Sequence, residues 1–206
     1  MVTAVCLFSG ATPAAAECKA DTALFSDDFS DFLDPTWGDA DEGMYVEDGA
    51  LVLKSDRAKV NFATNSQDVN ACVDTTIVDA PVPDYTSVGM VFWWTDWDNY
   101  YYLNYWPSGL VNINRVVKGK ASFLVAANPT KLNKGVGQTN SLELDLKGKT
   151  ATLLVNGQVA TRFKGLPPKN PGPIGFVAYG GDGKPSTFKF DNFVVNDTSQ
   201  QDTAQQ

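Results

Sequence analysis

Residues 89–106 read GMVFWWTDWDNYYYLNYW, and half of them are aromatic. Apolar and polar residues alternate on either side of a turn at 96–99. A period of two is that of a β-strand, because successive side chains of a strand point to opposite faces of its sheet. The stretch therefore predicts a β-hairpin, and it raises the question of whether its rings fill a core or form a binding surface.

The facing of these rings follows from the alternation. The more apolar set of the second strand is expected in the core and comprises Tyr101, Leu103 and Tyr105. The other set is expected on the outer face and comprises Tyr100, Tyr102, Asn104 and Trp106. In the first strand both faces are apolar; we assign Met90 and Phe92 to the core and Trp93 to the outer face. Val111 and Ile113 of the next segment point inward, whereas Asn112 and Asn114 point outward.

Short alternating segments of this kind continue from about residue 23 to 195. Turn signals such as Asn156-Gly157 and Asp48-Gly49 separate them. No segment shows helical periodicity over more than about two turns. The pattern predicts an all-β fold in which two antiparallel sheets pack into a β-sandwich, with a closed barrel as the alternative. The segment GLPPKNPGP at 165–173 is expected to be a crossover loop within one domain spanning 17–196.

The composition excludes several functions. The 206 residues contain no His, which rules out the usual Ser-His-Asp and Cys-His nucleophiles and imidazole-bound zinc. The net charge is −8, and the Lys and Arg residues do not cluster. Nucleic acids and anionic membranes require a basic patch. We therefore expect neither as a partner, and no membrane insertion.

The two ends of the chain are predicted to lie outside the domain. Residues 1–16 combine a short apolar run with the small residues of an export-signal cleavage site, although a basic leader is missing. They predict a signal peptide and a secreted or periplasmic protein; a cytosolic protein with an Ala-rich tail is the alternative. Residues 197–206 contain almost no apolar side chain and are expected to be disordered.

Cleavage of this leader would leave two of the three cysteines, Cys18 and Cys72. An even pair in an oxidising compartment predicts one disulfide bond. The alternative, a lipid-anchored Cys18, is disfavoured because Glu17 stands where a small residue is needed.

The outward side chains form a candidate glycan site. Sugars present C–H patches that stack on aromatic rings, and hydroxyls that pair with amides and carboxylates. Packing between neighbouring strands is the other explanation for such rings. The candidate glycan-binding residues are Trp93, Trp97, Tyr102, Asn104, Trp106, Asn112 and Asn114.

Two carboxylate patterns bear on catalysis and metal binding. Residues 143–148 (ELDLKG) begin like the E-x-D-x-x-E motif of retaining β-glucanases, but Gly148 stands where the second catalytic acid is required. We interpret them as an amphipathic strand. Asp96 and Asp98 offer oxygen ligands for Ca²⁺, although Asp is also common in turns. No cofactor other than this possible calcium is expected.

The order of these segments resembles that of the concanavalin A-like lectin/glucanase superfamily. The resemblance rests on residues 89–103, 108–120, 140–160, 173–181 and 188–195, with the recurrent pieces NG-x-V and FDNF. It is nearest to the laminin-G-like and DUF1080-type (3-keto-disaccharide-hydrolase-like) modules of secreted bacterial proteins. The resemblance implies a jelly-roll sandwich with a concave sheet that often receives glycans. The missing glucanase acid and the absent His depart from the hydrolytic members.

These observations lead to an expected function. We predict a secreted, non-catalytic glycan-binding module that acts as a monomer on a poly- or oligosaccharide. A carbohydrate-active hydrolase or lyase that uses carboxylates only is one alternative, and an envelope structural or protein-interaction domain is the other. A fold alone does not decide among them.

Overall fold

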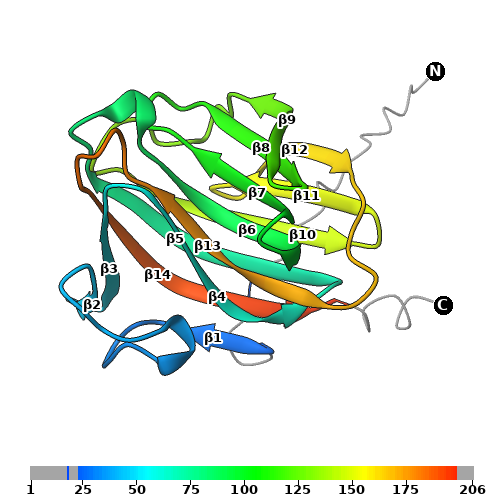
Figure 1. Ribbon diagram of the computed structural model, residues 1–206, viewed down its shortest axis with the longest axis horizontal. Helices are drawn as coiled ribbons and strands as arrows, with labels where there is room; N and C mark the ends of the chain where they lie inside the picture. The colour runs from blue at the N-terminus through cyan, green and yellow to red at the C-terminus, as the bar shows by residue number, and fades with distance from the viewer. Residues whose placement is uncertain (1–17, 19–22, 199–206) are drawn as a thin grey trace, which may run out of the picture.

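The computed structural model describes Cys18 and residues 23–198 (Figure 1). The predicted signal peptide, 1–16, lies outside the described residues, as does the predicted disordered tail except for Asp197 and Thr198. In the described part of the chain, the two 3-10 helices, η2 (Pro35–Trp37) and η3 (Pro83–Tyr85), have three residues each. No helix there has the length and apolar character that a membrane span requires.

The strands form two antiparallel sheets, as predicted. The eight-stranded sheet has the order β12-β11-β10-β5-β14-β3-β2, with β1 also paired to β14. Its strands are β1 (Phe25–Asp27), β2 (Met44–Glu47), β3 (Ala50–Ser55), β5 (Val69–Asp79), β10 (Thr139–Lys147), β11 (Thr150–Val155), β12 (Gln158–Lys164) and β14 (Ser186–Asp197). The six-stranded sheet has the order β4-β13-β6-β7-β8-β9. Its strands are β4 (Ala58–Ser66), β6 (Ser87–Asp96), β7 (Asn99–Tyr105), β8 (Val111–Val117), β9 (Lys120–Ala127) and β13 (Gly172–Tyr179).

The core lies between the two sheets and is built from the inward half of each alternating strand. The Phe176 ring of β13 stacks on Phe190 of β14, with the ring centroids 4.1 Å apart, and on Trp37 at 4.9 Å. All three side chains are almost completely buried. Burying an aromatic side chain of this size stabilises the fold by roughly 1.5–3 kcal/mol. The period of two therefore places a continuous apolar layer inside and leaves the outer faces for other roles.

The connections between strands follow from the conformational preferences of the residues that form them. Asn156 and Gly157 have φ of 48° and 75°, which is the left-handed conformation that a two-residue hairpin between β11 and β12 requires. The segment after β12 leaves the eight-stranded sheet and enters β13 of the six-stranded sheet, which confirms the predicted crossover. Figure 1 shows this connection running along the right edge of the molecule in yellow and orange.

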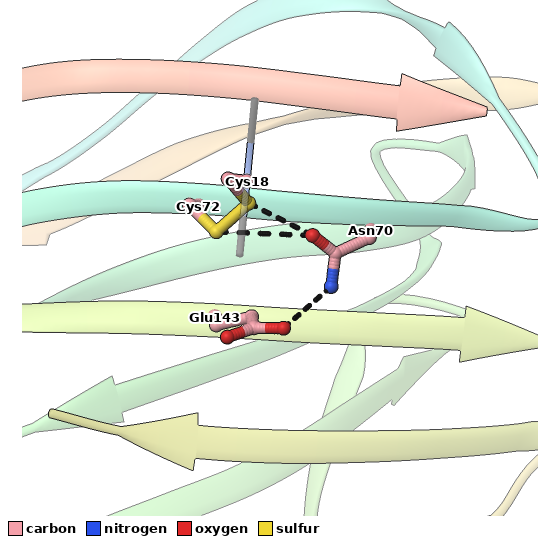
Figure 2. The surroundings of a disulfide bond; sticks show 4 residues. All are labelled: Cys18, Asn70, Cys72 and Glu143. Atoms are coloured by element: carbon pink, nitrogen blue, oxygen red, sulfur yellow. Dashed lines mark hydrogen bonds between the residues drawn. A yellow bond between two sulfur atoms is a disulfide. The ribbon is translucent and has the colours of Figure 1, made fainter. Parts of the chain in front are cut away.

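A disulfide joins Cys18 to Cys72 of β5, as predicted (Figure 2). Their Cα atoms are 6.1 Å apart, within the usual range for a disulfide. The bond holds Cys18 on the outer face of the eight-stranded sheet. Asn70 Oδ1 contacts the Cys18 sulfur at 2.8 Å and the Cys72 sulfur at 3.9 Å. Because a bonded sulfur carries no hydrogen, these are polar contacts only.

Removing this bond by a Cys18→Ala/Cys72→Ala double substitution is expected to lower the free energy of unfolding by up to about 4 kcal/mol. The bond closes a loop with a sequence separation of 54, and the chain-entropy model gives roughly this value for such a loop. Urea denaturation of both proteins, each with and without reductant, measures the loss. The double variant should not respond to reductant, and a loss below about 1 kcal/mol would contradict the prediction.

Candidate functional site on the six-stranded sheet

The aromatic hairpin is built as predicted except at Trp93. Tyr101, Leu103 and Tyr105 are buried between the sheets, and Tyr102 on the opposite face is half-buried. Trp93 also belongs to the core, with 3% of its surface exposed, so its assignment to the outer face is wrong. Its φ is 46°, and the pairing of β6 with β7 shifts register after Phe92.

Between the paired positions Phe92–Tyr101 and Asp96–Asn99, residues 93–95 of β6 stand opposite the single residue Tyr100 of β7, so the strand bulges and its alternation is reset. Phe92 and Trp93 consequently both point inward, where Trp93 packs edge-on against Tyr101 at 5.2 Å and against Phe163 at 5.9 Å. Trp94 takes the outer position instead and stacks on Tyr100, with the ring centroids 4.4 Å apart.

A hollow of ≈ 400 Å³ lies on the outer face of the six-stranded sheet. Its floor is apolar, and aromatic side chains surround it. It is lined by Ala58, Lys59 and Val60 of β4, Val91 of β6, Trp97 of the turn, Tyr100 and Tyr102 of β7, and Val177 and Tyr179 of β13. Of the predicted site residues, the hollow brings together Trp97 and Tyr102.

The rings of the hollow form a connected series. Tyr102 lies between Tyr100 and Tyr179, at centroid distances of 6.0 Å and 6.3 Å. Trp94 connects Tyr100 to Trp97, its centroid being 4.7 Å from that of Trp97. Trp97 is the most open of these rings, with 68% of its surface exposed. The series therefore offers several flat ring faces to a ligand, whereas the ring of Trp94 is buried by its neighbours.

The three tyrosines of the hollow keep neutral phenol groups at physiological pH. Burial, followed by the charges of Tyr179 and Tyr100, raises the pKa of Tyr102 to about 12. Burial also raises the pKa of Tyr100 and of Tyr179. Each phenol can thus donate one hydrogen bond and accept others while its ring face stays available for stacking.

Beside the hollow lies a row of amides that we name the amide row: Asn104, Asn112 and Asn114. In the β-ladder, Tyr102 stands opposite Asn114, and Asn104 opposite Asn112. Asn104 is buried and donates through Nδ2 to Ser87 Oγ at 2.7 Å, and Asn114 Nδ2 reaches Asn104 Oδ1 at 3.5 Å. Asn112 Oδ1 is buried and has no hydrogen-bond partner among the described protein atoms. The amides therefore share the predicted outer face, where Asn104 is enclosed and Asn112 and Asn114 are half-buried.

The remaining predicted residues lie at the margins. Trp106 follows the last residue of β7, is half-buried and does not line the hollow. Asp96 Oδ1 accepts hydrogen bonds from the backbone N of Asp98 and from Asn99 Nδ2, both at 2.8 Å. This is the role of a turn former. In residues 23–198 and Cys18, no group of three or more His, Cys, Asp or Glu is placed to hold a metal ion. Calcium binding at this turn stays a prediction.

The carboxylates of the glucanase-like segment lie on the other sheet. Leu142, Leu144 and Leu146 of β10 point into the core, as expected for an amphipathic strand, so Glu143 and Asp145 occupy the outer face of the eight-stranded sheet. Figure 2 shows Glu143 on β10 beside Asn70, whose Nδ2 donates to Glu143 Oε1 at 2.7 Å. These acids are therefore separated from the hollow by the whole core.

Burial raises the pKa of Glu143; the bond from Asn70 opposes this shift and the charge of Asp145 adds to it. A carboxyl whose folded-state pKa is raised holds its proton more tightly in the folded protein. Its contribution to stability is present below its unfolded pKa and is lost as the pH rises through the folded-state pKa.

Glu143→Gln is therefore expected to raise the melting temperature relative to the parent at pH 7. At pH 4 the increase should be smaller, or the melting temperature should fall below that of the parent. The Gln carbonyl can still accept the bond from Asn70. Thermal melts at both pH values measure the effect, with exposed Glu47→Gln as the matched control. A melting-temperature difference that does not change with pH would contradict it.

Sequence reasoning missed part of the site. Tyr100 belongs to the predicted outer face but not to the predicted site, which also lacks Trp94, Tyr179, Val60, Val91 and Val177. Alternation in PIGFVAYGG would have directed Tyr179 outward. No local signal places β13 beside β6, however, because 84 to 92 residues separate the paired positions, from Gly175–Val91 to Tyr179–Ser87.

Comparison with known proteins shows the fold of the chain. No family model and no curated sequence matches it. Its structure is similar to the carbohydrate-binding module CBM66 from Bacillus subtilis, with a TM-score of 0.59 and 17% identity over 81% of this chain and 94% of that one. It is also similar to the catalytic domain of an endo-1,3-β-glucanase (laminarinase) from Thermotoga petrophila RKU-1, with a TM-score of 0.60 and 14% identity over 86% and 98% of the two chains.

The β-glucanase of Bacillus licheniformis is similar as well, with a TM-score of 0.60 and 11% identity over 84% of this chain and 97% of that one. At such identities the likeness shows a shared fold and not a shared activity. The finer resemblance to laminin-G-like and DUF1080-type modules stays a prediction. The chain thus has an all-β, jelly-roll β-sandwich fold, which it shares with these solved structures.

Proposed function

We propose that this chain is a secreted, non-catalytic glycan-binding module whose site is the hollow together with the amide row. The observation that carries the proposal is the joining of Tyr100, Tyr102, Tyr179 and Trp97 around one apolar hollow. Amides border the hollow where Tyr102 pairs with Asn114. A pyranose ring has the complementary surface, since its C–H groups stack on rings and its hydroxyls bond to amides and phenols.

The position of the acids supports binding rather than cleavage. Retaining glycosidases place two carboxyl groups about 5–5.5 Å apart on either side of the scissile bond, and inverting enzymes place them somewhat further apart. Asp and Glu do not occur among the described residues that line the hollow. Glu143 and Asp145 lie on the far sheet, so they are not available to a sugar held in the hollow.

The similar solved structures support a glycan as the partner, because they are a carbohydrate-binding module and two glucanases. The disulfide supports an oxidising, extracytoplasmic location. The partner is a poly- or oligosaccharide, and the protein acts as a monomer.

A glycan array probed with the purified chain tests the proposal. Binding to at least one glycan class is expected, and prolonged incubation with that glycan should yield no shorter products by mass spectrometry. The absence of any bound glycan would overturn the proposal. Release of shorter products would instead favour the carboxylate-dependent hydrolase.

A further inference from the structure

A second cavity of ≈ 560 Å³ adjoins the hollow, and we name it the loop cavity. It lies between strands β6, β7 and β8 and the crossover connection after β12. Tyr100 lines both the loop cavity and the hollow. The two cavities therefore meet at Tyr100, the hollow on the outer face of the sheet and the loop cavity at its end, where Tyr101 and Arg115 face inward.

Arg115 of β8 supplies a positively charged guanidinium group to the loop cavity. It stands opposite Tyr101 in the ladder, and its guanidinium carbon lies 5.4 Å from the centroid of the Tyr101 ring. The side chain is half-buried. Although the chain carries 24 acidic residues against 16 basic ones, none of the described carboxylates forms an ion pair with Arg115. A guanidinium is thus stacked and positioned, and its hydrogen-bond donors are not used by a carboxylate.

The crossover connection adds a second positive charge. Lys169 and Asn170 line the loop cavity from the side opposite the strands, and Lys169 is exposed. The described lining contains no Asp or Glu, so the cavity is a positively charged region in a strongly acidic molecule. A guanidinium in such a cavity matches the planar oxygens of a carboxylate, or the oxygens of a sulfate, through two parallel hydrogen bonds.

We propose that the loop cavity binds the acidic group of an anionic glycan, a uronate carboxylate or a sulfate ester, while an adjacent sugar of the same chain occupies the hollow. The proposal rests on the proposed function and specifies its ligand class. Arg115 is the principal contact and Lys169 assists it. Because the chain is acidic overall, it repels polyanions in general. Binding of an anionic glycan therefore depends on the positive charges of the loop cavity.

An array that carries each glycan in an acidic and a neutral form tests the proposal. The pairs are oligogalacturonides with their methyl esters, and dextran sulfate with unmodified dextran. Calorimetry on the strongest pair should give at least about tenfold tighter binding of the acidic form. The pair that responds distinguishes a carboxylate from a sulfate.

Arg115→Gln should abolish this preference, and Lys169→Gln should reduce it in part. Lys184→Gln, with the same change of charge in the exposed β13–β14 turn, should preserve it. Equal binding of the two forms, retention of the preference in Arg115→Gln, or an equal loss in Lys184→Gln would overturn the anionic-glycan assignment alone. Failure of both forms of every glycan to bind would overturn the proposed function as well.

Discussion

Replacing Tyr102 by Ala is expected to weaken glycan binding at least about 30-fold, the loss typical of a central aromatic contact. Tyr102 is the middle ring of the hollow, with Tyr100 and Tyr179 on either side. It also stands beside the amide row, opposite Asn114. Its removal would take away the main stacking face and one phenol donor at the same time.

The cost to stability should be smaller than that of a core substitution, because Tyr102 is half-buried and outside the core. Calorimetry with the strongest array ligand measures binding, and thermal melting measures stability. Tyr102→Phe should keep most of the affinity and so separate stacking from hydrogen bonding. Tyr85→Ala, an exposed tyrosine of η3, is the matched control and should bind as the parent does. Unchanged affinity in Tyr102→Ala would show that the ring serves sheet packing.

Replacing Tyr105 by Ala is expected to lower the free energy of unfolding by about 3–5 kcal/mol. Only 2% of its surface is exposed, so truncation leaves a cavity between the sheets. Its hydroxyl donates to the Thr75 carbonyl oxygen at 3.1 Å and lies 3.1 Å from Thr75 Oγ1. Since Tyr105 belongs to β7 and Thr75 to β5, this phenol also connects the two sheets.

Urea denaturation measures the loss. Tyr105→Phe keeps the ring and should cost about 1 kcal/mol, the usual net value of one hydrogen bond. Trp93→Ala should resemble Tyr105→Ala because Trp93 lies in the core. A small loss for Tyr105→Ala, similar to that of Tyr102→Ala, would contradict the division of the hairpin into a buried face and an open face.

The results for Tyr102→Ala and Tyr105→Ala together show which rings of the aromatic hairpin are needed for folding and which for binding. Core rings are required for folding, and outer rings are available for binding, although they belong to one continuous stretch of sequence. Trp94 stands between these roles, since its neighbours bury it on the outer face. We expect it to support Tyr100 and Trp97 rather than to contact a sugar directly.

Much of this arrangement was predictable from the sequence because it depends on local backbone geometry. A strand alternates whatever surrounds it, so the inward facing of Tyr101, Leu103 and Tyr105 and the outward facing of Tyr102 and Asn104 follow from the order of residues alone. Turn residues such as Asn156-Gly157 likewise carry their own conformational preference. The even cysteine pair behind a predicted leader indicated the disulfide.

Only the tertiary structure determined which outward side chains meet. Tyr179 joins Tyr102 because β13 lies beside β6, a pairing between distant segments that no local pattern encodes. Trp93 turned inward because a bulge with φ of 46° reset the alternation, and the apolar character of both faces of β6 hid that shift. Arg115 and Lys169 share a cavity for the same reason, since the crossover connection is distant from β8 in the sequence and lies beside it only in the folded molecule. The alternation of side chains is determined within one strand. Which side chains meet in a site depends instead on the order of the strands, and that order is set by the burial of both sheets together.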